Sequence, residues 1–512
     1  MRSHVEVPPQ VEPPTFSLVE APLDQGGSLV VALPVLRGDG DDGLTLGPGA
    51  AEFLEAQPLD LFAVLDHHGA TGKAGEVVSH PLLDGEAPTT VLLVGVGSGS
   101  TSDLRAAGAA LGRAVKDRDQ LATTITSLAD DQGLRAFVVG LVLGSFEFHW
   151  RRDGAKAQPV RRVLLAGGTE LQPVLDRAVA VAAAGWRARH LASVPSNVKN
   201  PAWLVEQARE AADETGLKLT VWDEEKLDAE GFGGILAVGA ASQSPPRMIR
   251  LDYTPRRGIK RADGHVALVG KGITFDTGGL SIKPGEAMVN MKRDMTGGAV
   301  VIATMAALAA VDCPIRVTGL VPTAENAIGG SAYRPGDVIT HFGGRTTEVT
   351  NTDAEGRLVM ADALAYAVAK VKPDALVDIA TLTGAMKVAL GLRTGGFFAN
   401  DESLASAIDE SGATSGERLW RMPLADEYEE KLSSKVADGD NGAGNPGAIT
   451  AALFLQHFTG GLPWAHLDVA SVGDAPTDVN EWTAGPTGFG ARTLITWLER
   501  ENPLDGVTKG RR

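Results

Sequence analysis

Short, nearly continuous apolar runs recur along this chain and constrain its fold more than any other feature. Ala-rich helical stretches such as residues 104–115 separate them. Uninterrupted apolar strands are typical of parallel sheets that helices cover on both faces. We therefore expect an α/β fold built from mostly parallel sheets flanked by helices. The runs begin at Ser28, Thr89, Arg161, His265, Pro314, Asp374 and Pro463.

The length of 512 residues predicts two domains. Periodicity breaks in LASVPSNVKNP, residues 191–201, before a new helical pattern starts at Trp203. Residues 1–15 are rich in proline and acid and lack hydrophobic periodicity, so we expect a flexible tail there. The predicted domains are an N-terminal α/β domain over residues 16–190 and a larger C-terminal α/β domain over residues 191–505.

Composition narrows the possible partners and compartments. The chain has 47 Lys and Arg against 64 Asp and Glu, a net charge of −17, which opposes general binding to nucleic acid. The single cysteine, Cys313, cannot form an intrachain disulfide. The first residues lack the apolar core of a secretory signal, and no apolar stretch approaches the ~18 residues that span a bilayer. We expect a cytoplasmic protein that does not enter membranes.

Two lysines and an aspartate follow the apolar run at His265, in GKGITFDTGGLSIK. Ligand crevices of α/β sheets lie outside the carboxyl ends of the strands, so Lys271, Asp276 and Lys283 are candidates for a functional site. Glycines around them would let the backbone approach a ligand closely. A surface loop with an ion pair, or a tight turn, is the alternative.

Further acids appear at Asp294, before an Ala-rich stretch over residues 299–311, and in NTDAEGRL, residues 351–358. Asp294 alone could be an acid that favours a helix start. Thr352-x-x-Glu355 fits a capping box, in which both side chains satisfy free N–H groups of a helix. A capping box does not explain Asp353 or Arg357, whereas a metal site with an anion-holding arm would.

Three aspartates, one glutamate and two lysines between Lys271 and Glu355 are many charges for an apolar core unless cations neutralise the acids. The ten histidines are scattered and no HExxH occurs. Carboxylate-rich ligation favours Mn²⁺, Mg²⁺ or Zn²⁺, with two ions ~3.5–4 Å apart if acids bridge them. The residues thus predict a metal site, with the helix-cap alternatives still open.

At these residues the chain resembles the M17 leucyl aminopeptidases. NTDAEGRL is the octapeptide signature of that family, and KGITFDTGGLSIKP, MKRDM, DIATLTGA and EWTAGPTGFGARTL resemble its catalytic domain. The resemblance covers roughly residues 190–500. It implies a metal-dependent aminopeptidase that removes N-terminal leucine and other apolar residues from peptides, acting as a homohexamer.

The resemblance also implies a role for each matching residue. It implies two divalent ions per subunit, Mn²⁺ or Zn²⁺, that activate a water, with the substrate's α-amine on one ion. Lys283 would stabilise the oxyanion, and Arg357 would hold a bicarbonate that shuttles protons. The substrate pocket would be lined by Met291, Thr381, Leu382 and Gly384, although Met291 fits an ordinary core equally well. One ion would bind Lys271, Asp276, Asp294 and Glu355, and the other Asp276, Asp353 and Glu355.

Two features lie outside this pattern. Thr296 stands where many members of the family carry only small residues, so it could narrow or polarise the edge of the site. In the N-terminal domain, GVGSGS at residues 95–100 follows a strand and precedes a helix, as a nucleotide-binding loop does, but misses the last glycine of GxGxxG. Such loops are usually turns. No GxSxG occurs, which opposes serine hydrolysis.

Overall fold

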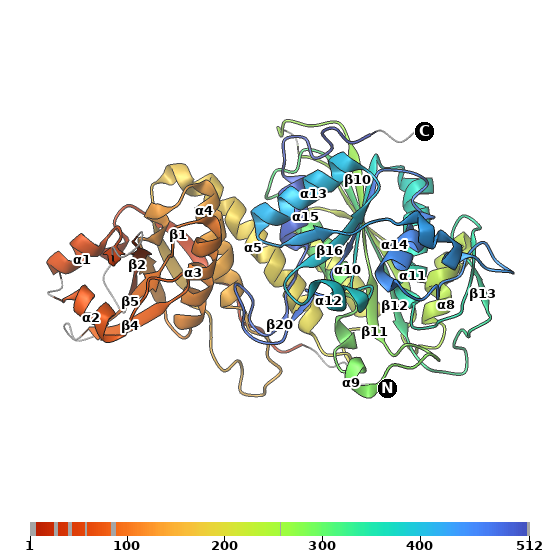
Figure 1. The fold of residues 1–512 in the computed structure, drawn as a ribbon, viewed down its shortest axis with the longest axis horizontal. Coiled ribbons are helices and arrows are strands. Elements are labelled where there is room, and N and C mark those ends of the chain that lie inside the picture. Colours follow the sequence, from red (N-terminus) through yellow and green to blue (C-terminus); the bar gives the residue numbers. More distant parts are fainter. Residues whose placement is uncertain are drawn as a thin grey trace. The chain divides into compact units, whose positions relative to one another are not determined.

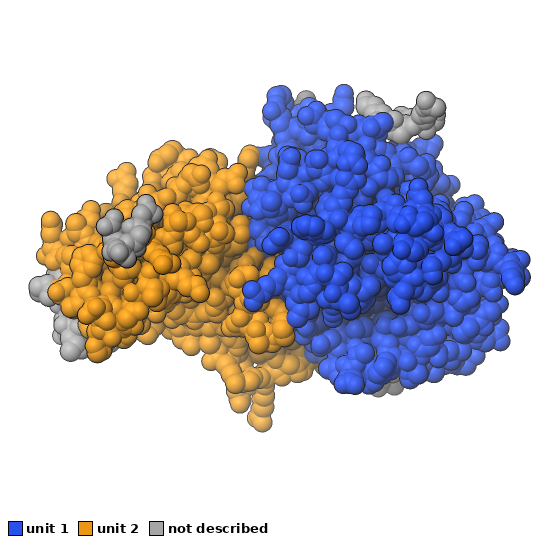
Figure 2. Space-filling view, viewed as in Figure 1, with its two compact units in different colours: residues 1–6, 187–474, 486–512 blue, residues 7–186, 475–485 orange. Residues whose placement is uncertain are grey.

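The computed structural model describes residues 7–24, 29–38, 43–56, 59–82, 89–256 and 258–508. They form two compact units (Figure 2). The N-terminal unit contains residues 7–186 and 475–485, and the larger unit contains residues 187–474 and the chain from residue 486 onward. The division falls within helix α5 (Gln172–Ser193).

The N-terminal unit is built on a seven-stranded sheet in the order β1-β7-β6-β2-β5-β4, with β3 paired to β2 (Figure 1). Neighbours from β1 to β5 are parallel, and β4 and β3 are antiparallel additions. The strands are β1 (Thr15–Val19), β2 (Leu29–Arg37), β3 (Leu44–Leu46), β4 (Val77–Leu82), β5 (Thr89–Gly95), β6 (Gln120–Thr123) and β7 (Arg162–Ala166). Its helices are α1 (Ala50–Ala56), α2 (Leu61–His67), α3 (Thr101–Ala114), α4 (Asp131–Gly144) and the first part of α5.

Part of the segment that we expected to be a flexible tail is packed instead. Val11 is buried, and the Gln10 amide donates to the carbonyl of His149 at 2.9 Å. Strand β1 then begins at Thr15 and pairs with β7. An edge strand of the sheet and one apolar side chain therefore fix this segment. Such a short segment leaves no hydrophobic periodicity in the sequence. Residues 1–6 lie outside the described residues.

The larger unit is built on a nine-stranded sheet in the order β17-β16-β18-β15-β10-β12-β9-β8, with β11 paired to β12. Its centre is parallel, because β18, β15, β10, β12 and β11 run in one direction. The strands are β8 (Lys218–Trp222), β9 (Arg247–Tyr253), β10 (His265–Gly270), β11 (Gly272–Asp276), β12 (Arg316–Asn326), β15 (Ala375–Ala380), β16 (Gly395–Ala399), β17 (Leu419–Arg421) and β18 (Trp464–Asp468); β13 (Val338–Thr340) and β14 (Thr346–Glu348) form a separate hairpin.

Helices cover this sheet. Helix α10 packs on β10, β12 and β15 beside α6 and α15, and α11 packs with α8 and α14 (Figure 1). Every residue of β10 and β15 is buried, as expected of strands covered on both faces. The helices are α6 (Pro201–Thr215), α7 (Glu224–Glu230), α8 (Gly233–Gly239), α9 (Gly285–Met288), α10 (Thr296–Ala307), α11 (Glu355–Tyr366), α12 (Ala385–Leu390), α13 (Glu402–Ser415), α14 (Gly447–Gln456) and α15 (Ala491–Leu498).

The α/β fold with two mostly parallel sheets flanked by helices is thus confirmed. Because the central strands of the larger unit are parallel, their carboxyl ends share one edge of the sheet. Asp276, Asn326 and Asp468 are the last residues of β11, β12 and β18. Within the described ranges, no helix is both long enough and apolar enough to cross a membrane.

Candidate metal centre

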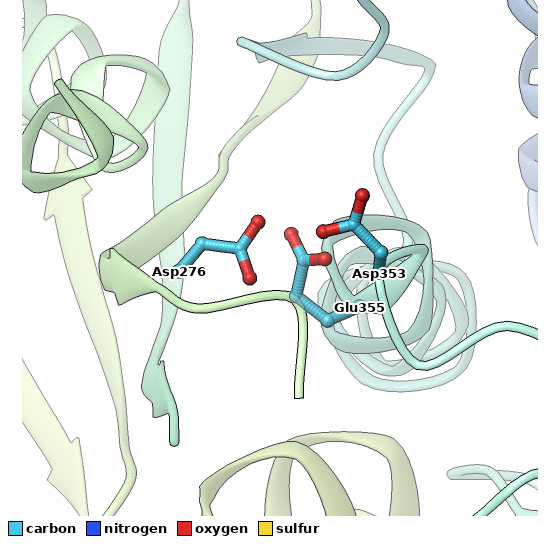
Figure 3. Close-up of side chains that lie close together, drawn as sticks. All are labelled: Asp276, Asp353 and Glu355. Atoms are coloured by element: carbon cyan, nitrogen blue, oxygen red, sulfur yellow. The ribbon is translucent and has the colours of Figure 1, made fainter. Parts of the chain in front are cut away.

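Three carboxylates meet at this edge of the larger sheet. Asp276 ends β11, Asp353 precedes α11, and Glu355 is the first residue of α11. One oxygen from each lies within 4.8 Å of the others, and Figure 3 shows the three groups facing one another. Asp276 and Glu355 are buried, and Asp353 is partly exposed. The structure therefore brings Asp276 to two acids that follow it by more than 70 residues in the sequence.

Lys271 joins Asp294 to this group. Its Nζ lies 2.7 Å from Asp294 Oδ2 and 2.9 Å from Glu355 Oε1, and all three side chains are buried. Lys271 stands in the turn between β10 and β11, and Asp294 follows the short helix η4 (Met291–Arg293). The buried Lys271 is thus a direct neighbour of two acids.

Lys283 is the second cation of the cluster. Its Nζ lies 2.8 Å from Asp276 Oδ2 and also contacts Asp353 Oδ1. Its side chain is 16% exposed, against 3% for Lys271. Lys283 therefore stands at the accessible side of the cluster and Lys271 inside it.

The capping-box alternative for Thr352 and Glu355 is wrong, and no side-chain hydrogen bond caps the helix that begins after Asp294. Neither α10 nor α11 has a side-chain cap hydrogen bond at its start. The Thr352 hydroxyl donates to Gly278 O at 2.7 Å and accepts from Ser281 N at 2.7 Å, so it ties its segment to the loop after β11. Glu355 faces Lys271 instead of a backbone amide. Long-range charges therefore override the local capping pattern.

One glycine of the signature is needed for close packing. A Cβ at Gly356 would lie 2.3 Å from Cε and 2.6 Å from Nζ of Lys271. Only a residue without a side chain lets the start of α11 approach the buried lysine this closely. The glycine of NTDAEGRL thus makes room for Lys271 between Asp294 and Glu355.

The charges of the cluster do not balance. Four carboxylates and two ammonium groups leave a net charge of −4 + 2 = −2. Burial raises the pKa of Asp294 well above its usual value, with repulsion from Glu355 and Asp276 added. Burial also raises the pKa of Asp276 and Asp353. Additional positive charge would therefore stabilise the ionised acids.

The pKa values of the two lysines are also raised, but in a lysine this favours the charged form. Burial alone would lower the pKa of Lys271, but Asp294, Glu355 and Asp276 outweigh burial and raise it. Asp276 and Glu355 likewise outweigh burial and raise the pKa of Lys283. Both side chains are therefore ammonium groups in this arrangement, and they take the positions between acids where cations are needed.

This donor set fits divalent metal. It offers carboxylate oxygens from several directions, and the buried Glu355 Oε2 has no hydrogen-bond partner among the described residues. Carboxylates suit Mg²⁺ and Mn²⁺, and Zn²⁺ accepts carboxylate and nitrogen ligands. The same set includes an amine, Lys271, which could serve as a ligand only after losing its proton.

Arg357 is the third residue of α11, two residues after Glu355. Its Nη1 donates to Asn441 O at 2.8 Å, and its buried Nε has no hydrogen-bond partner within the described part of the chain. Burial lowers the pKa of its guanidinium to about 10, against attraction from Glu355 and Asp468. It remains a cation at neutral pH with a donor free for an anion.

The predicted substrate residues stand around the same edge. Leu382 packs against the larger core, and a Cβ added at Gly384 would have no atom of another segment within 4 Å. Met291 is half-buried in η4, which packs on β11. Thr381 bonds to the cluster directly, because its hydroxyl donates to Asp294 Oδ1 at 2.9 Å and its carbonyl accepts from Lys271 Nζ at 3.3 Å.

Thr296 does not line the site as its position in the motif suggested. Its side chain is fully buried, and its hydroxyl donates to Arg293 O at 2.6 Å. The hydroxyl therefore closes the turn between η4 and α10 and leaves the edge of the site unchanged.

Two polar residues at strand ends received no role from the sequence. The buried Asn326 amide donates to Asp276 Oδ1 at 2.8 Å and to Thr352 O at 3.1 Å, which ties β11 to the signature segment. Asp468 accepts from the backbone of Leu382 and Thr383. Both are the last residue of a parallel strand, and this position is the feature of the sequence that could have identified them.

In the glycine-rich loop of the N-terminal unit, residues 95–100, a carboxylate of the chain takes the hydrogen-bond donors that a phosphate would use. Ser98 donates from its amide and its hydroxyl to Asp103 Oδ2, at 3.0 and 2.8 Å. Ser100 Oγ accepts from Asp103 N. A carboxylate of the chain itself occupies the start of α3, and a second anion there would be repelled.

Comparisons with known proteins agree with this geometry. The catalytic domain of the cytosol aminopeptidase family matches residues 186–495, and the N-terminal domain of the same family matches residues 33–153. A relative from Syntrophotalea carbinolica named "Probable cytosol aminopeptidase" is 41% identical over 455 residues, 85% of this chain and 91% of the relative. A relative of the same name from Streptomyces coelicolor is 39% identical and covers 95% of this chain and 98% of its own length.

Solved structures match as well. The structure "Bottromycin maturation enzyme BotP in complex with Mn" superimposes with a TM-score of 0.81 and 36% identity, covering 93% of this chain and 99% of that chain. A second BotP structure gives a TM-score of 0.80 and 37% identity. The similarity therefore extends over both units.

Proposed function

The chain belongs to the cytosol aminopeptidase family, which supports metal-dependent aminopeptidase activity, and from this premise we propose a leucyl aminopeptidase that uses two divalent ions. It would release leucine and other apolar residues from the N-termini of peptides. The observation that carries the proposal is the convergence of Asp276, Asp353 and Glu355, with Lys271 and Asp294 beside them.

The ligands follow from that cluster and from the family resemblance. Lys271, Asp276, Asp294 and Glu355 would hold one ion, and Asp276, Asp353 and Glu355 the other. When bound, the two ions supply an acidified water and polarise the scissile carbonyl. One of the matching BotP structures is a complex with Mn, which makes Mn²⁺ the first ion to test and Zn²⁺ the second.

Lys283 and Arg357 would act on the reacting groups. Lys283 is a partly exposed ammonium group at the edge of the cluster, where it can face negative charge that develops on the substrate carbonyl oxygen. Arg357 keeps its charge at neutral pH and has a free Nε, which suits a small anion such as bicarbonate that moves a proton.

Selection of the free N-terminus would follow from binding of the α-amine to one ion. A free α-amine has a lone pair that can bind one of the two ions, whereas the nitrogen of an acetylated amine is not basic. Met291, Thr381, Leu382 and Gly384 would line the side-chain pocket, and a flexible Met suits several apolar residues. A homohexamer in the cytoplasm completes the proposal, on the resemblance to the family.

The test is hydrolysis of L-leucine amide and of N-acetyl-L-leucine amide by the full chain. We expect release of ammonia from the first in the presence of Mn²⁺ or Zn²⁺, loss of that activity with a chelator, and recovery when the ion returns. Cleavage of the acetylated amide at a comparable rate would exclude an aminopeptidase. A panel of other aminoacyl amides then ranks side-chain preference.

A further inference from the structure

Asp468 is a fully buried carboxylate that serves the site from outside the ligand set. It ends β18, next to β15 in the sheet. Its Oδ1 accepts from Leu382 N at 3.1 Å and Ala470 N at 3.2 Å. Its Oδ2 accepts from Thr383 N at 3.1 Å and from the Thr383 hydroxyl at 2.6 Å. Both oxygens are therefore used by backbone amides and one hydroxyl.

Those donors belong to the segment that follows β15, residues 381–384. The first residue of this segment, Thr381, contacts the cluster twice, through its hydroxyl to Asp294 and through its carbonyl to Lys271 Nζ. Lys271 N also donates to Ile379 O at 3.1 Å at the end of β15. A continuous path of contacts thus leads from the Asp468 carboxylate through the backbone of Leu382 and Thr383 to Thr381.

We propose that Asp468 is a positioning residue, which fixes the 381–384 segment and through Thr381 sets the orientation of Lys271 and Asp294. The inference rests on the proposed function, because it assigns Asp468 a part in organising the ligands of one of the two ions. Charge-assisted hydrogen bonds to N–H groups are stronger and shorter than neutral ones, which suits a rigid support. Residues that hold metal ligands in place typically change metal affinity by about 10–100-fold when they are altered.

The chemistry of the position demands a carboxylate. Asn has the same size, but its side chain accepts only through Oδ1 and its NH₂ group would face either the Leu382 and Ala470 amides or the Thr383 donors. Asp468→Asn should therefore turn the 381–384 segment away while leaving the volume of the core unchanged.

Asp362 provides a matched control. It is also fully buried, and it accepts from Ile235 N at 2.9 Å and Phe342 N at 3.0 Å, with His341 as a further partner. It lies in the middle of α11, and none of these three partners is a proposed metal ligand. Asp362→Asn therefore reports the general cost of neutralising a buried carboxylate in this unit.

The experiment measures Mn²⁺ binding to the full chain by isothermal titration calorimetry, together with kcat, KM and Tm. For Asp468→Asn we expect at least tenfold weaker binding at one of two sites and a lower kcat, with the second site retained. Asp362→Asn should lower the Tm without weakening either site. Mn²⁺ binding, kcat and KM all equal to wild type in Asp468→Asn would overturn the inference.

Thr383 gives a second measurement if Asp468→Asn does not fold. Thr383→Val removes one donor to Asp468 Oδ2, and Thr383→Ser keeps it, so we expect several-fold weaker Mn²⁺ binding in the first and recovery in the second. Equal binding in Thr383→Val and wild type would contradict the inference alone. A wild-type chain that binds no Mn²⁺ or Zn²⁺ would overturn the proposed function, and the inference with it.

Discussion

The two units contain the same local sequence pattern and use it differently. Ser100-x-x-Asp103 stands at the start of α3 in the N-terminal unit, and Thr352-x-x-Glu355 at the start of α11 in the larger unit. In the first, the Ser100 hydroxyl accepts from Asp103 N and the Asp103 carboxylate accepts from Ser98, so the motif caps its helix. In the second, neither side chain caps α11, and Glu355 faces Lys271.

The difference lies in what approaches each acid from elsewhere in the sequence. Asp103 is satisfied by donors within five residues, and those bonds lower its pKa against the effect of burial. Glu355 meets an ammonium group and two other carboxylates, from β11 and from the loop before α11. An acid that local donors satisfy is a cap, whereas an acid that faces other acids needs a cation. Variants of the cluster can therefore be paired with variants of the cap.

The largest effect is expected from removing Glu355. Glu355→Ala removes a buried carboxylate from the proposed ligand set of both ions, so metal content and turnover should fall together. We expect kcat/KM to fall by at least about 10³-fold, which corresponds to about 4 kcal/mol of activation free energy. Asp353→Ala should act in the same direction. Metal content is measured by atomic absorption on protein dialysed against Mn²⁺, and rates are measured with L-leucine amide.

Asp103→Ala is the control for that comparison. It removes an equivalent acid from the cap of α3 and should leave kcat/KM unchanged while costing about 1 kcal/mol of stability. Full metal occupancy in both Glu355→Ala and Asp353→Ala would mean that these acids are only structural, like Asp103.

Lys283→Ala should have the next largest effect. Lys283 lies at the accessible side of the cluster, so its loss removes positive charge from the reacting oxygen but leaves every proposed metal ligand in place. We expect kcat to fall by roughly 10²–10³-fold, as for the loss of one oxyanion donor, with metal content close to wild type. Unchanged turnover would remove Lys283 from the mechanism.

Much of the fold could be predicted because apolar runs report burial locally. The runs at His265, Pro314, Asp374 and Pro463 are β10, β12, β15 and β18, and their continuous burial reflects helices on both faces. The packed segment around Val11 and β1 was not predictable in this way, because one buried side chain and an edge pairing leave no periodic signal. Sheet order likewise depends on contacts between distant segments.

The site was predictable as a set of residue types but not as a set of roles. Asp294 and Glu355 each fit a helix start in the sequence, and only the folded chain shows that both form ion pairs with Lys271. Asp468 and Asn326 received no role from the sequence because Leu382, a partner of Asp468, is 86 residues away and Asp276, a partner of Asn326, is 50 residues away. Strand ends indicate where to look, but only the folded chain reveals which groups bond to one another.

Metal should stabilise the protein through the cluster and not through the cap. An ion that binds only the folded state at 100 times its Kd adds about 2.7 kcal/mol to the free energy of unfolding. Mn²⁺ should therefore raise the Tm of wild type and of Asp103→Ala by similar amounts, and raise that of Glu355→Ala little. Differential scanning calorimetry with and without chelator measures these shifts. An equal rise in Glu355→Ala would assign the stabilising ion to another part of the chain.

The smallest effect is expected from neutralising one acid of the cluster, Asp353, and the acid at the cap of α3, Asp103, in metal-free protein. The pKa of Asp353 is raised, chiefly by burial, so its ionised form is disfavoured in the folded state. This loss of folding free energy is absent below the unfolded pKa of about 3.9 and grows as the pH rises above it. The pKa of Asp103 is lowered, because its hydrogen bonds with Ser98 and Ser100 outweigh burial. Its ionised form therefore stabilises the fold above about pH 3.9, and that stabilisation is lost as the pH falls through the folded pKa. At pH 7 and with chelator present, Asp353→Asn should raise the Tm and Asp103→Asn should lower it, by roughly 1–3 °C each. Both differences should shrink toward pH 4, and shifts of the same sign in the two variants would show that Asp353 is satisfied without a metal ion, as Asp103 is.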